Sequence, residues 1–232
     1  MLNYIFIFIL GAIIASFLNV VAISLPIKQN WWSRQSACPH CQTTLKPQQL
    51  IPIFSFIMQK GRCKSCQNTI SVLYPLVEVI GGILFIIPSF LYPSQVLLPQ
   101  QTWLFFSLLL IVSLTDFHYQ LIPNKILIAF GIPLFLIRPN ITVAIISFLF
   151  FYGTALFGKI YFKKDTIGGG DIKLYFVIGF VLPIQYLFLA IAISSVTALL
   201  YIHIFSKNKH APLAFAPFIA LGSIIAHLLA IS

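Results

Sequence analysis

Residues 2–25 read LNYIFIFILGAIIASFLNVVAISL, an apolar run without a single charged side chain. A helix of this length, rising about 1.5 Å per residue, is long enough to cross a hydrocarbon core about 30 Å thick. No basic residue precedes the run, as one would in a secretory signal, and Lys28 and Arg34 follow it. The sequence therefore predicts a retained transmembrane helix whose N-terminus lies outside the cytoplasm.

Seven further apolar runs continue this pattern along the chain. They cover residues 72–91, 96–115, 121–137, 141–161, 172–183, 184–205 and 213–231. The stretch 172–205 is too long for one span, so we divide it at Pro183. We expect an all-α, polytopic transmembrane helical bundle of about eight spans. Along the chain it divides into the first span (1–26), a polar loop (27–71) and the remaining membrane-embedded bundle (72–232).

The composition excludes the main classes of soluble protein. Of 232 residues, 59% are hydrophobic and 8% are charged, whereas a soluble domain carries about 25% charged residues. Disorder needs the opposite balance. The net charge of +10 would suit a nucleic-acid-binding protein, but the basic residues lie in short connections between apolar runs. We therefore expect membrane lipids as partners, and no nucleic acid.

The basic residues also orient the spans. With the N-terminus outside, every Lys and Arg except Arg138 falls in a connection on the cytoplasmic side. This distribution agrees with the positive-inside rule. It predicts a multi-pass protein of the cell membrane, with the polar loop 27–71 in the cytoplasm.

All four cysteines lie in that loop, as two Cys-x-x-Cys pairs. Four thiolates at this spacing can hold Zn²⁺ in a tetrahedron. Disulfides or free thiols are the alternatives, and a reducing cytoplasm disfavours the disulfides. A site with four cysteines is closed to substrate, so we expect a structural zinc that staples the loop. The predicted ligands are Cys38, Cys41, Cys63 and Cys66.

Two of the four carboxylates stand near the predicted cytoplasmic membrane surface. Asp116 follows the third apolar run, and Asp171 opens the sixth. Two adjacent carboxylates share one proton, so that one activates water while the other protonates a scissile carbonyl. From the residues alone, this aspartic protease chemistry and a proton-relay pair in a transporter both remain open. Asp171 is also placed to cap its helix, whereas an anion at a helix C-terminus, as expected for Asp116, is unfavourable.

Three glycines precede Asp171. Side chains at Gly168, Gly169 and Gly170 would keep a peptide backbone away from the carboxylate, and glycine tolerates unusual dihedral angles at a break between loop and helix. We therefore predict that this run lets substrate approach. Glu78, in the second span, has three interpretations: it pairs with a nearby Lys, serves a cofactor site or stabilises packing.

Taken together, these motifs resemble the prepilin peptidases, which remove the leader of type IV prepilins and belong to the intramembrane aspartic proteases with a Gly-x-Gly-Asp motif. The resemblance covers nearly the whole chain in colinear order. It rests on Ala15–Val21, Leu25-Pro26, the two cysteine pairs, Ile51–Ser55, Gly61–Cys63, Ile70-Ser71, Tyr74–Glu78, Asp116 with Ile122–Asn124, Gly168–Leu174 and Phe215–Phe218.

The resemblance implies that Asp116 and Asp171 are the catalytic aspartates. It implies an endopeptidase that cuts the basic leader of a prepilin or pseudopilin after a glycine, at the cytoplasmic face. It also implies N-methylation of the new N-terminus, with S-adenosylmethionine as donor and Glu78 as one candidate for the methyl-transfer site. A proton-coupled transporter and a scaffold for pilus or competence assembly are the alternatives from other classes.

The chain departs from the family pattern at three places. It has Ser24 before Leu25-Pro26, where family members often carry Arg or His, and Leu73 before Tyr74, where Arg is common. Ala214–Pro217 stands where Pro-Phe-Gly-Pro is usual. None of these touches the aspartate pair. The first two lie in the region associated with methylation, so cleavage is the better supported of the two expected activities.

Overall fold

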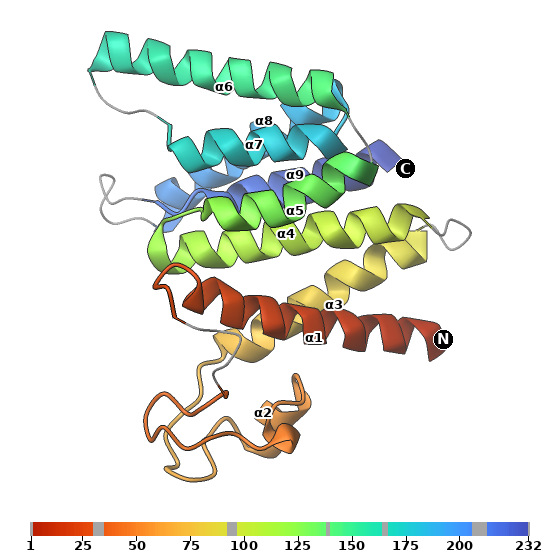
Figure 1. Cartoon of the computed structure of the whole chain (residues 1–232), viewed down its shortest axis with the longest axis vertical. Helices are drawn as coiled ribbons and strands as arrows, with labels where there is room; N and C mark the ends of the chain where they lie inside the picture. The colour runs from red at the N-terminus through yellow and green to blue at the C-terminus, as the bar shows by residue number, and fades with distance from the viewer. Residues whose placement is uncertain are drawn as a thin grey trace. The chain divides into compact units, whose positions relative to one another are not determined.

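The computed structural model describes residues 2–29, 35–91, 97–137, 140–163, 167–205 and 213–231. Over these residues the chain is helical and has no β-sheet, only two isolated β-bridges in the polar loop. The all-α prediction is therefore confirmed. The chain forms two compact units, Met1–Pro99 and Gln100–Ser232, whose helices are labelled in Figure 1.

The first unit is built on two long apolar helices, α1 (Leu2–Ser24) and α3 (Leu73–Leu91). They approach closely because small residues face each other. A Cβ on Gly11 would stand 2.6 Å from the Gly81 carbonyl oxygen, and a Cβ on Gly81 would overlap Ala15. Such small-residue contacts are typical of helix pairs in membranes. The polar loop between the two helices carries a 3₁₀ turn, η1 (Pro47–Gln49), and a short helix, α2 (Phe54–Met58).

The second unit contains six helices among its described residues. These are α4 (Leu97–Tyr119, whose first residues precede the unit boundary), α5 (Asn124–Ile137), α6 (Ile141–Phe162), α7 (Gly169–Val181), α8 (Ile184–Phe205) and α9 (Ala216–Ile231). The helix α6 packs on α7, α7 on α5, and α8 on α9. Close approach again depends on glycine: Gly179 lies against the Ala144 backbone, and Gly222 against Ser194.

The helix α4 supplies much of the core of this unit. Phe105, Phe106, Leu108, Ile111 and Val112 are all at most 1% exposed. One polar contact lies among them: Thr102 Oγ1 is 3.0 Å from Nε2 of His227 in α9, and the His227 ring packs against both phenylalanines. The N-terminal half of α4 is therefore fixed against the C-terminal half of α9.

Among the described residues, eight helices coincide with the eight predicted apolar runs, but they are not equally long. Five of them, α1, α3, α4, α6 and α8, are long and apolar enough to cross a membrane. The other three have 14, 13 and 16 residues, about 20–24 Å at 1.5 Å per residue, which is short of a 30 Å core. The protein is thus an integral membrane protein, while the count of eight crossings stays a prediction.

Prolines account for several helix boundaries. The predicted division at Pro183 is confirmed, because α7 ends at Val181 and α8 begins at Ile184. Likewise α5 begins only at Asn124, after Pro123. The predicted three-part division of the chain stays a prediction, although the compact units group α3 with α1 rather than with the later helices.

Candidate functional site

Asp116 lies in the last turn of α4, where the negative end of the helix dipole is unfavourable for an anion. The second unit compensates for this. The backbone N–H of Ala216, the first residue of α9, donates a 2.8 Å hydrogen bond to Asp116 Oδ2, and the Phe215 backbone amide also interacts with the carboxylate. Asp116 is only 7% exposed. The positive end of α9 therefore holds a buried carboxylate at the end of α4.

Asp171 lies in the first turn of α7, as the third residue of the helix. The N-cap position belongs to Gly168, and no side chain caps this helix. The interpretation of Asp171 as an N-cap is therefore wrong, because α7 begins three residues earlier than that interpretation requires. Its carboxylate is instead directed near the Gly168 backbone, since a Cβ on Gly168 would lie 3.0 Å from Asp171 Oδ2.

The fold brings these two carboxylates together from positions 55 residues apart in sequence. Asp171 is near enough to Asp116 for direct electrostatic repulsion. Repulsion of this kind disfavours ionisation of both groups at once, so a state with one proton on the pair is favoured. The arrangement is suited to general acid–base chemistry, with one group protonated and the other ionised.

The three glycines have different surroundings. Gly168 adjoins the Asp171 carboxylate, and a Cβ on Gly170 would stand 3.0 Å from Cβ of Ile122, whereas Gly169 has open space within 4 Å. None of them has a positive φ; the only such glycine among the described residues is Gly61. The expectation of unusual dihedral angles is therefore wrong, because Gly169 and Gly170 are already helical. The lack of side chains at Gly168 and Gly170 leaves room for the Asp171 carboxylate and for Ile122, and the surroundings of Gly169 are open.

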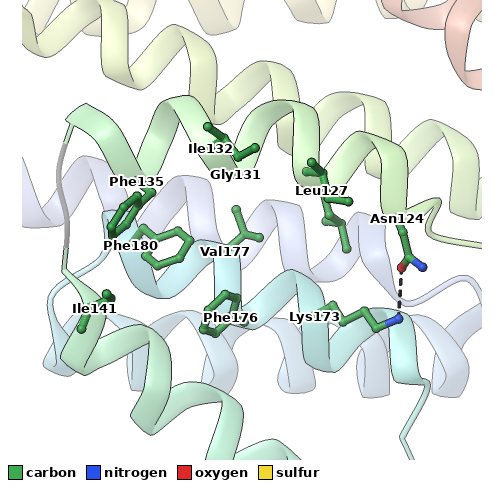
Figure 2. A pocket seen from close by; sticks show the side chains of 11 residues that line it. Asn124, Leu127, Gly131, Ile132, Phe135, Ile141, Lys173, Phe176, Val177 and Phe180 are labelled. Carbon is green, nitrogen blue, oxygen red and sulfur yellow. Dashed lines mark hydrogen bonds between the residues drawn. The ribbon is translucent and has the colours of Figure 1, made fainter.

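A groove of about 570 Å³ runs between α5 and α7, with apolar side chains along most of its length (Figure 2). At one end Lys173 Nζ donates a 3.0 Å hydrogen bond to Asn124 Oδ1. Lys173 follows Asp171 by two residues, about 200° around the helix, so the two side chains leave opposite sides of α7. The groove is therefore separate from the carboxylate pair.

In the first unit, the four cysteines gather as predicted. Their sulfur atoms all lie within 4.8 Å of one another. Cys38 Sγ is 3.8 Å from Cys66 Sγ, and Cys41 Sγ is 4.0 Å from Cys63 Sγ. Four sulfurs bound to Zn²⁺ at about 2.3 Å in a tetrahedron stand about 3.8 Å apart. The cluster can thus hold a metal ion.

The two cysteine pairs are copies of one small structure. In the first, Cys38 N–H donates to the Thr43 carbonyl and Leu45 N–H to the Ser36 carbonyl; in the second, residues 25 positions later make the same bonds. Gln42 and Gln67 both adopt positive φ, at 57° and 58°. The shared sequence Cys-x-x-Cys-Gln-x-Thr was the signal for this repeat, which the sequence analysis missed.

Hydrogen bonds within these copies favour the thiolate, the form that binds metal, at Cys41 and Cys63, whereas burial and the neighbouring cysteines raise the pKa of Cys66 to about 11. The Thr43 hydroxyl and backbone lower the pKa of the Cys41 thiol to about 6. Backbone hydrogen bonds from Cys66 and Ser65 lower the pKa of Cys63. The amides of these two residues therefore point at the Cys63 sulfur.

Glu78 is 8% exposed, and both of its carboxylate oxygens are engaged within the first unit. Ser16 of α1 donates a 2.8 Å hydrogen bond to Oε1, and the backbone N–H of Ile53 donates a 2.7 Å bond to Oε2. Glu78 therefore ties α1, α3 and the polar loop together. Sequence analysis named Glu78 but not these two partners, which no spacing rule links to it.

The bond to Ile53 supports an unusual turn. Ile53 has φ 61° and ψ −53°, and Phe54 N–H donates to the Pro52 carbonyl across it. This is a γ-turn with positive φ, which is rare and strained for a β-branched residue. A strained turn persists only where its surroundings fix it, and the buried Glu78 carboxylate is the contact that does so.

Each of the two units contains a region that matches a known protein-family model. Residues 9–92 match the family model of the bacterial peptidase A24 N-terminal domain, and residues 103–203 match that of the type IV leader peptidase family. No solved structure matches the chain.

Relatives from several bacteria match over most of their length. The chain is 40% identical to the prepilin leader peptidase/N-methyltransferase of Bacillus subtilis (strain 168), covering 98% of this chain and 94% of that protein. It is 31% identical to the type 4 prepilin-like proteins leader peptide-processing enzyme of Escherichia coli O78:H11, with 92% and 89% covered. It is also 31% identical to the prepilin leader peptidase/N-methyltransferase of Legionella pneumophila, with 86% and 74% covered. On this identity and coverage, together with the two matched domains, the chain belongs to the type IV leader peptidase family.

Proposed function

We propose that this protein is an intramembrane aspartic endopeptidase in which Asp116 and Asp171 are the catalytic residues. The observation that carries the proposal is the electrostatic proximity of these two carboxylates, one buried and one half-buried, at the ends of α4 and α7. A leader peptidase needs side chains that activate water and protonate the scissile peptide bond, and carboxylates can do both. In residues 100–232 the sequence contains a single other carboxylate, Asp165.

The reaction follows from the shared proton. The ionised carboxylate takes a proton from water as the water oxygen attacks the scissile carbonyl carbon, while the protonated partner gives its proton to the carbonyl oxygen. When the tetrahedral intermediate collapses, the C–N bond breaks, the leaving amine accepts the proton that the first carboxylate took from water, and a hydroxyl of the intermediate returns a proton to the second carboxylate. The pair ends the cycle with the one shared proton it began with.

The hydrogen bond from Ala216 suggests how the two roles are divided. A carboxylate that accepts backbone N–H bonds at a helix N-terminus is favoured in its ionised form. We therefore assign Asp116 as the base that activates water and Asp171 as the acid that protonates the carbonyl. The open space at Gly169 lies beside this acid and is the proposed path for the substrate backbone.

The substrate is proposed from the family and its relatives. It is a type IV prepilin or pseudopilin precursor, cut after a glycine between its basic leader and its apolar helix. The charge pattern of the sequence supports a cell-membrane location with the N-terminus outside and the aspartates near the cytoplasmic face.

The cysteine cluster is proposed to hold Zn²⁺ as a structural ion. The sulfur separations and the hydrogen bonds to Cys41 and Cys63 fit a tetrahedral thiolate site. With four protein ligands such a site has no open position for substrate, so it fixes the loop and takes no part in hydrolysis.

N-methylation of the new N-terminus, with S-adenosylmethionine as donor, is the second proposed activity, and it rests on the printed names of the relatives. The first unit contains one carboxylate that could attract the cationic sulfonium, Glu78. Both of its oxygens already accept hydrogen bonds from Ser16 and Ile53. Among the described residues we therefore identify no binding site for S-adenosylmethionine.

The test is cleavage of a pilin-like precursor by the purified enzyme in detergent. Wild type is compared with Asp116→Asn and Asp171→Asn, and with Asp165→Asn as the matched carboxylate control. We expect both site variants to lose cleavage while the control keeps it. Wild-type rates in either site variant would refute the dyad and favour a transporter or an assembly scaffold. Mass spectrometry of the product tests methylation through a gain of about 14 Da, one CH₂, with S-adenosylmethionine.

A further inference from the structure

The polar loop carries a cluster of exposed apolar side chains that neither the cysteine site nor the aspartate site uses. In residues 50–58, the side chains of Leu50, Ile51, Phe54, Ile57 and Met58 are between 44% and 65% exposed. In water, so many large apolar groups on nine consecutive residues form an unusual surface, and they indicate a membrane or protein contact. We call residues 50–58 the apolar segment.

Hydrogen bonds fix the depth of this segment relative to the two helices of its own unit. Ile53 N–H binds Glu78, and Glu78 binds Ser16. Ser16 lies eight residues before the end of α1, about 12 Å along its axis, and Glu78 lies five residues inside α3, about 7.5 Å from its start. Both helices are candidate membrane spans. Ile53 is therefore held beside the spans, well inside their cytoplasmic ends, and not above them.

Figure 1 agrees with this depth. In this view α2 lies below α1 and the start of α3, within the projected length of α1 and not past its C-terminal end. An interfacial segment buries its apolar side about 5–10 Å into the boundary between headgroups and acyl chains. The depth given by the Glu78 bonds falls in the same range.

The charges on either side of the segment also suit a lipid surface. Lys46 precedes it, and Lys60, Arg62 and Lys64 follow it; all four are exposed. Residues 27–71 contain no Asp or Glu. Cations that flank an apolar segment are attracted to anionic headgroups, and this attraction adds to the burial of the apolar side chains.

We propose that residues 50–58 form an interfacial membrane anchor, inserted into the cytoplasmic leaflet and held at that depth by the Glu78–Ile53 hydrogen bond. The anchor holds the cysteine loop against the bilayer. Its apolar side chains contact lipid, and its flanking basic side chains contact anionic headgroups. The proposal does not depend on the peptidase activity.

The experiment labels the intact wild-type protein in nanodiscs of phosphatidylcholine and phosphatidylglycerol. One sample is labelled with a lipid-soluble reagent that forms a carbene on illumination, and a second sample with hydroxyl radicals generated in the aqueous phase. Mass spectrometry locates the labelled residues. We expect the carbene to label residues 50–58 as it labels lipid-facing residues of α1. We expect hydroxyl radicals to label the two cysteine copies, residues 36–45 and 61–70, in preference.

A variant tests the cause of the insertion. Ile57→Lys with Met58→Lys places two charges on the apolar segment, and we expect its carbene labelling to fall about fivefold while the spans keep theirs. Asn68→Lys, on the second cysteine copy, is the matched control and should leave the labelling unchanged. Hydroxyl-radical labelling of residues 50–58 in the wild type would show a solvated loop and overturn the proposal. Protection from both reagents would also overturn it, because it would mean that protein covers the segment.

Discussion

The Asp116 carboxylate at the end of α4 accepts a 2.8 Å hydrogen bond from the Ala216 backbone N–H at the start of α9. The two residues are 100 positions apart in sequence. The Ala216 N–H stabilises the anion at the end of α4, and the carboxylate satisfies an N–H group at the start of α9. The last turn of α4 has unsatisfied carbonyls and disfavours an anion, whereas the first turn of α9 has unsatisfied N–H groups and favours one. The contact therefore stabilises a buried carboxylate at a helix end that would otherwise disfavour it.

The Asp116→Asn variant should lose activity while it keeps the stability of the wild-type protein. The Asn side-chain oxygen can still accept the bond from Ala216, so Asp116→Asn should unfold close to the wild-type temperature. Asp116→Ala leaves a buried N–H without its acceptor and should cost about 1–3 kcal/mol. Thermal unfolding in detergent measures both. Equal destabilisation by the two variants would contradict the structural role given to this hydrogen bond.

The three glycines before Asp171 should respond differently to alanine. Gly170→Ala should lower the melting temperature, because its Cβ would crowd the β-branched Ile122 at 3.0 Å. Gly168→Ala should reduce kcat, because its Cβ would press on the Asp171 carboxylate, also at 3.0 Å.

Gly169→Ala is the informative member of the series. Nothing lies within 4 Å of the added methyl group, and alanine favours a helix by up to about 1 kcal/mol over glycine, so stability should not fall. If the substrate backbone passes here, KM should rise while the melting temperature stays. An unchanged KM would remove Gly169 from the proposed substrate path.

Glu78 should be a strong determinant of stability in the first unit. Glu78→Ala leaves the Ile53 N–H and the Ser16 hydroxyl without their acceptor, and hydrogen bonds to a charged group contribute about 1.5–3 kcal/mol each. Glu78→Gln keeps one carbonyl acceptor and should lose less. A double-mutant cycle with Ser16→Ala measures the coupling between the two residues. A coupling near zero would contradict the contact.

The cysteine cluster should bind about one zinc ion per chain, measured by elemental analysis of the purified protein. Cys63→Ser should lose most of this zinc. His40→Ala should keep it, because His40 is exposed and lies outside the cluster of four sulfurs. Removal of the metal with a chelator should make residues 36–70 sensitive to protease, since the metal and not a hydrophobic core holds such a loop. Resistance to protease after complete metal removal would show that the ion is dispensable for the fold.

Close packing of α1 on α3 gives a further test. Gly81→Leu should be strongly destabilising, because even a methyl group at this position overlaps Ala15. Gly153→Leu in α6 is the matched control, since nothing lies within 4 Å of its added Cβ. Thermal unfolding distinguishes the two. Equal effects would mean that the loss comes from removing glycine and not from the contact.

Much of this protein follows from the sequence because the governing effects are local in the chain. Length and hydropathy predicted the apolar helices, since a span must satisfy its own backbone hydrogen bonds. Pro183 marked the break between α7 and α8 because a proline disfavours helix in the residue before it. The cysteine spacing predicted the cluster, because a Cys-x-x-Cys turn already aims two sulfurs at one point.

Other features depend on contacts between segments that no local rule connects. The sequence placed Asp116 and Asp171 near the same membrane surface as a candidate pair, with two chemistries open. The packing of α4, α7 and α9 brings them together and supplies the Ala216 bond, which the sequence did not predict. The sequence predicted a helix cap at Asp171 and unusual dihedral angles at its glycines, whereas the fold starts the helix earlier and uses the glycines for space. Glu78 remained ambiguous until Ser16 and Ile53 were seen to share it. Hydropathy and spacing thus determined the helices and the cysteine site, because these effects act within a few residues. Tertiary structure alone decided which polar groups meet, because a buried hydrogen bond depends on the positions of both partners in space.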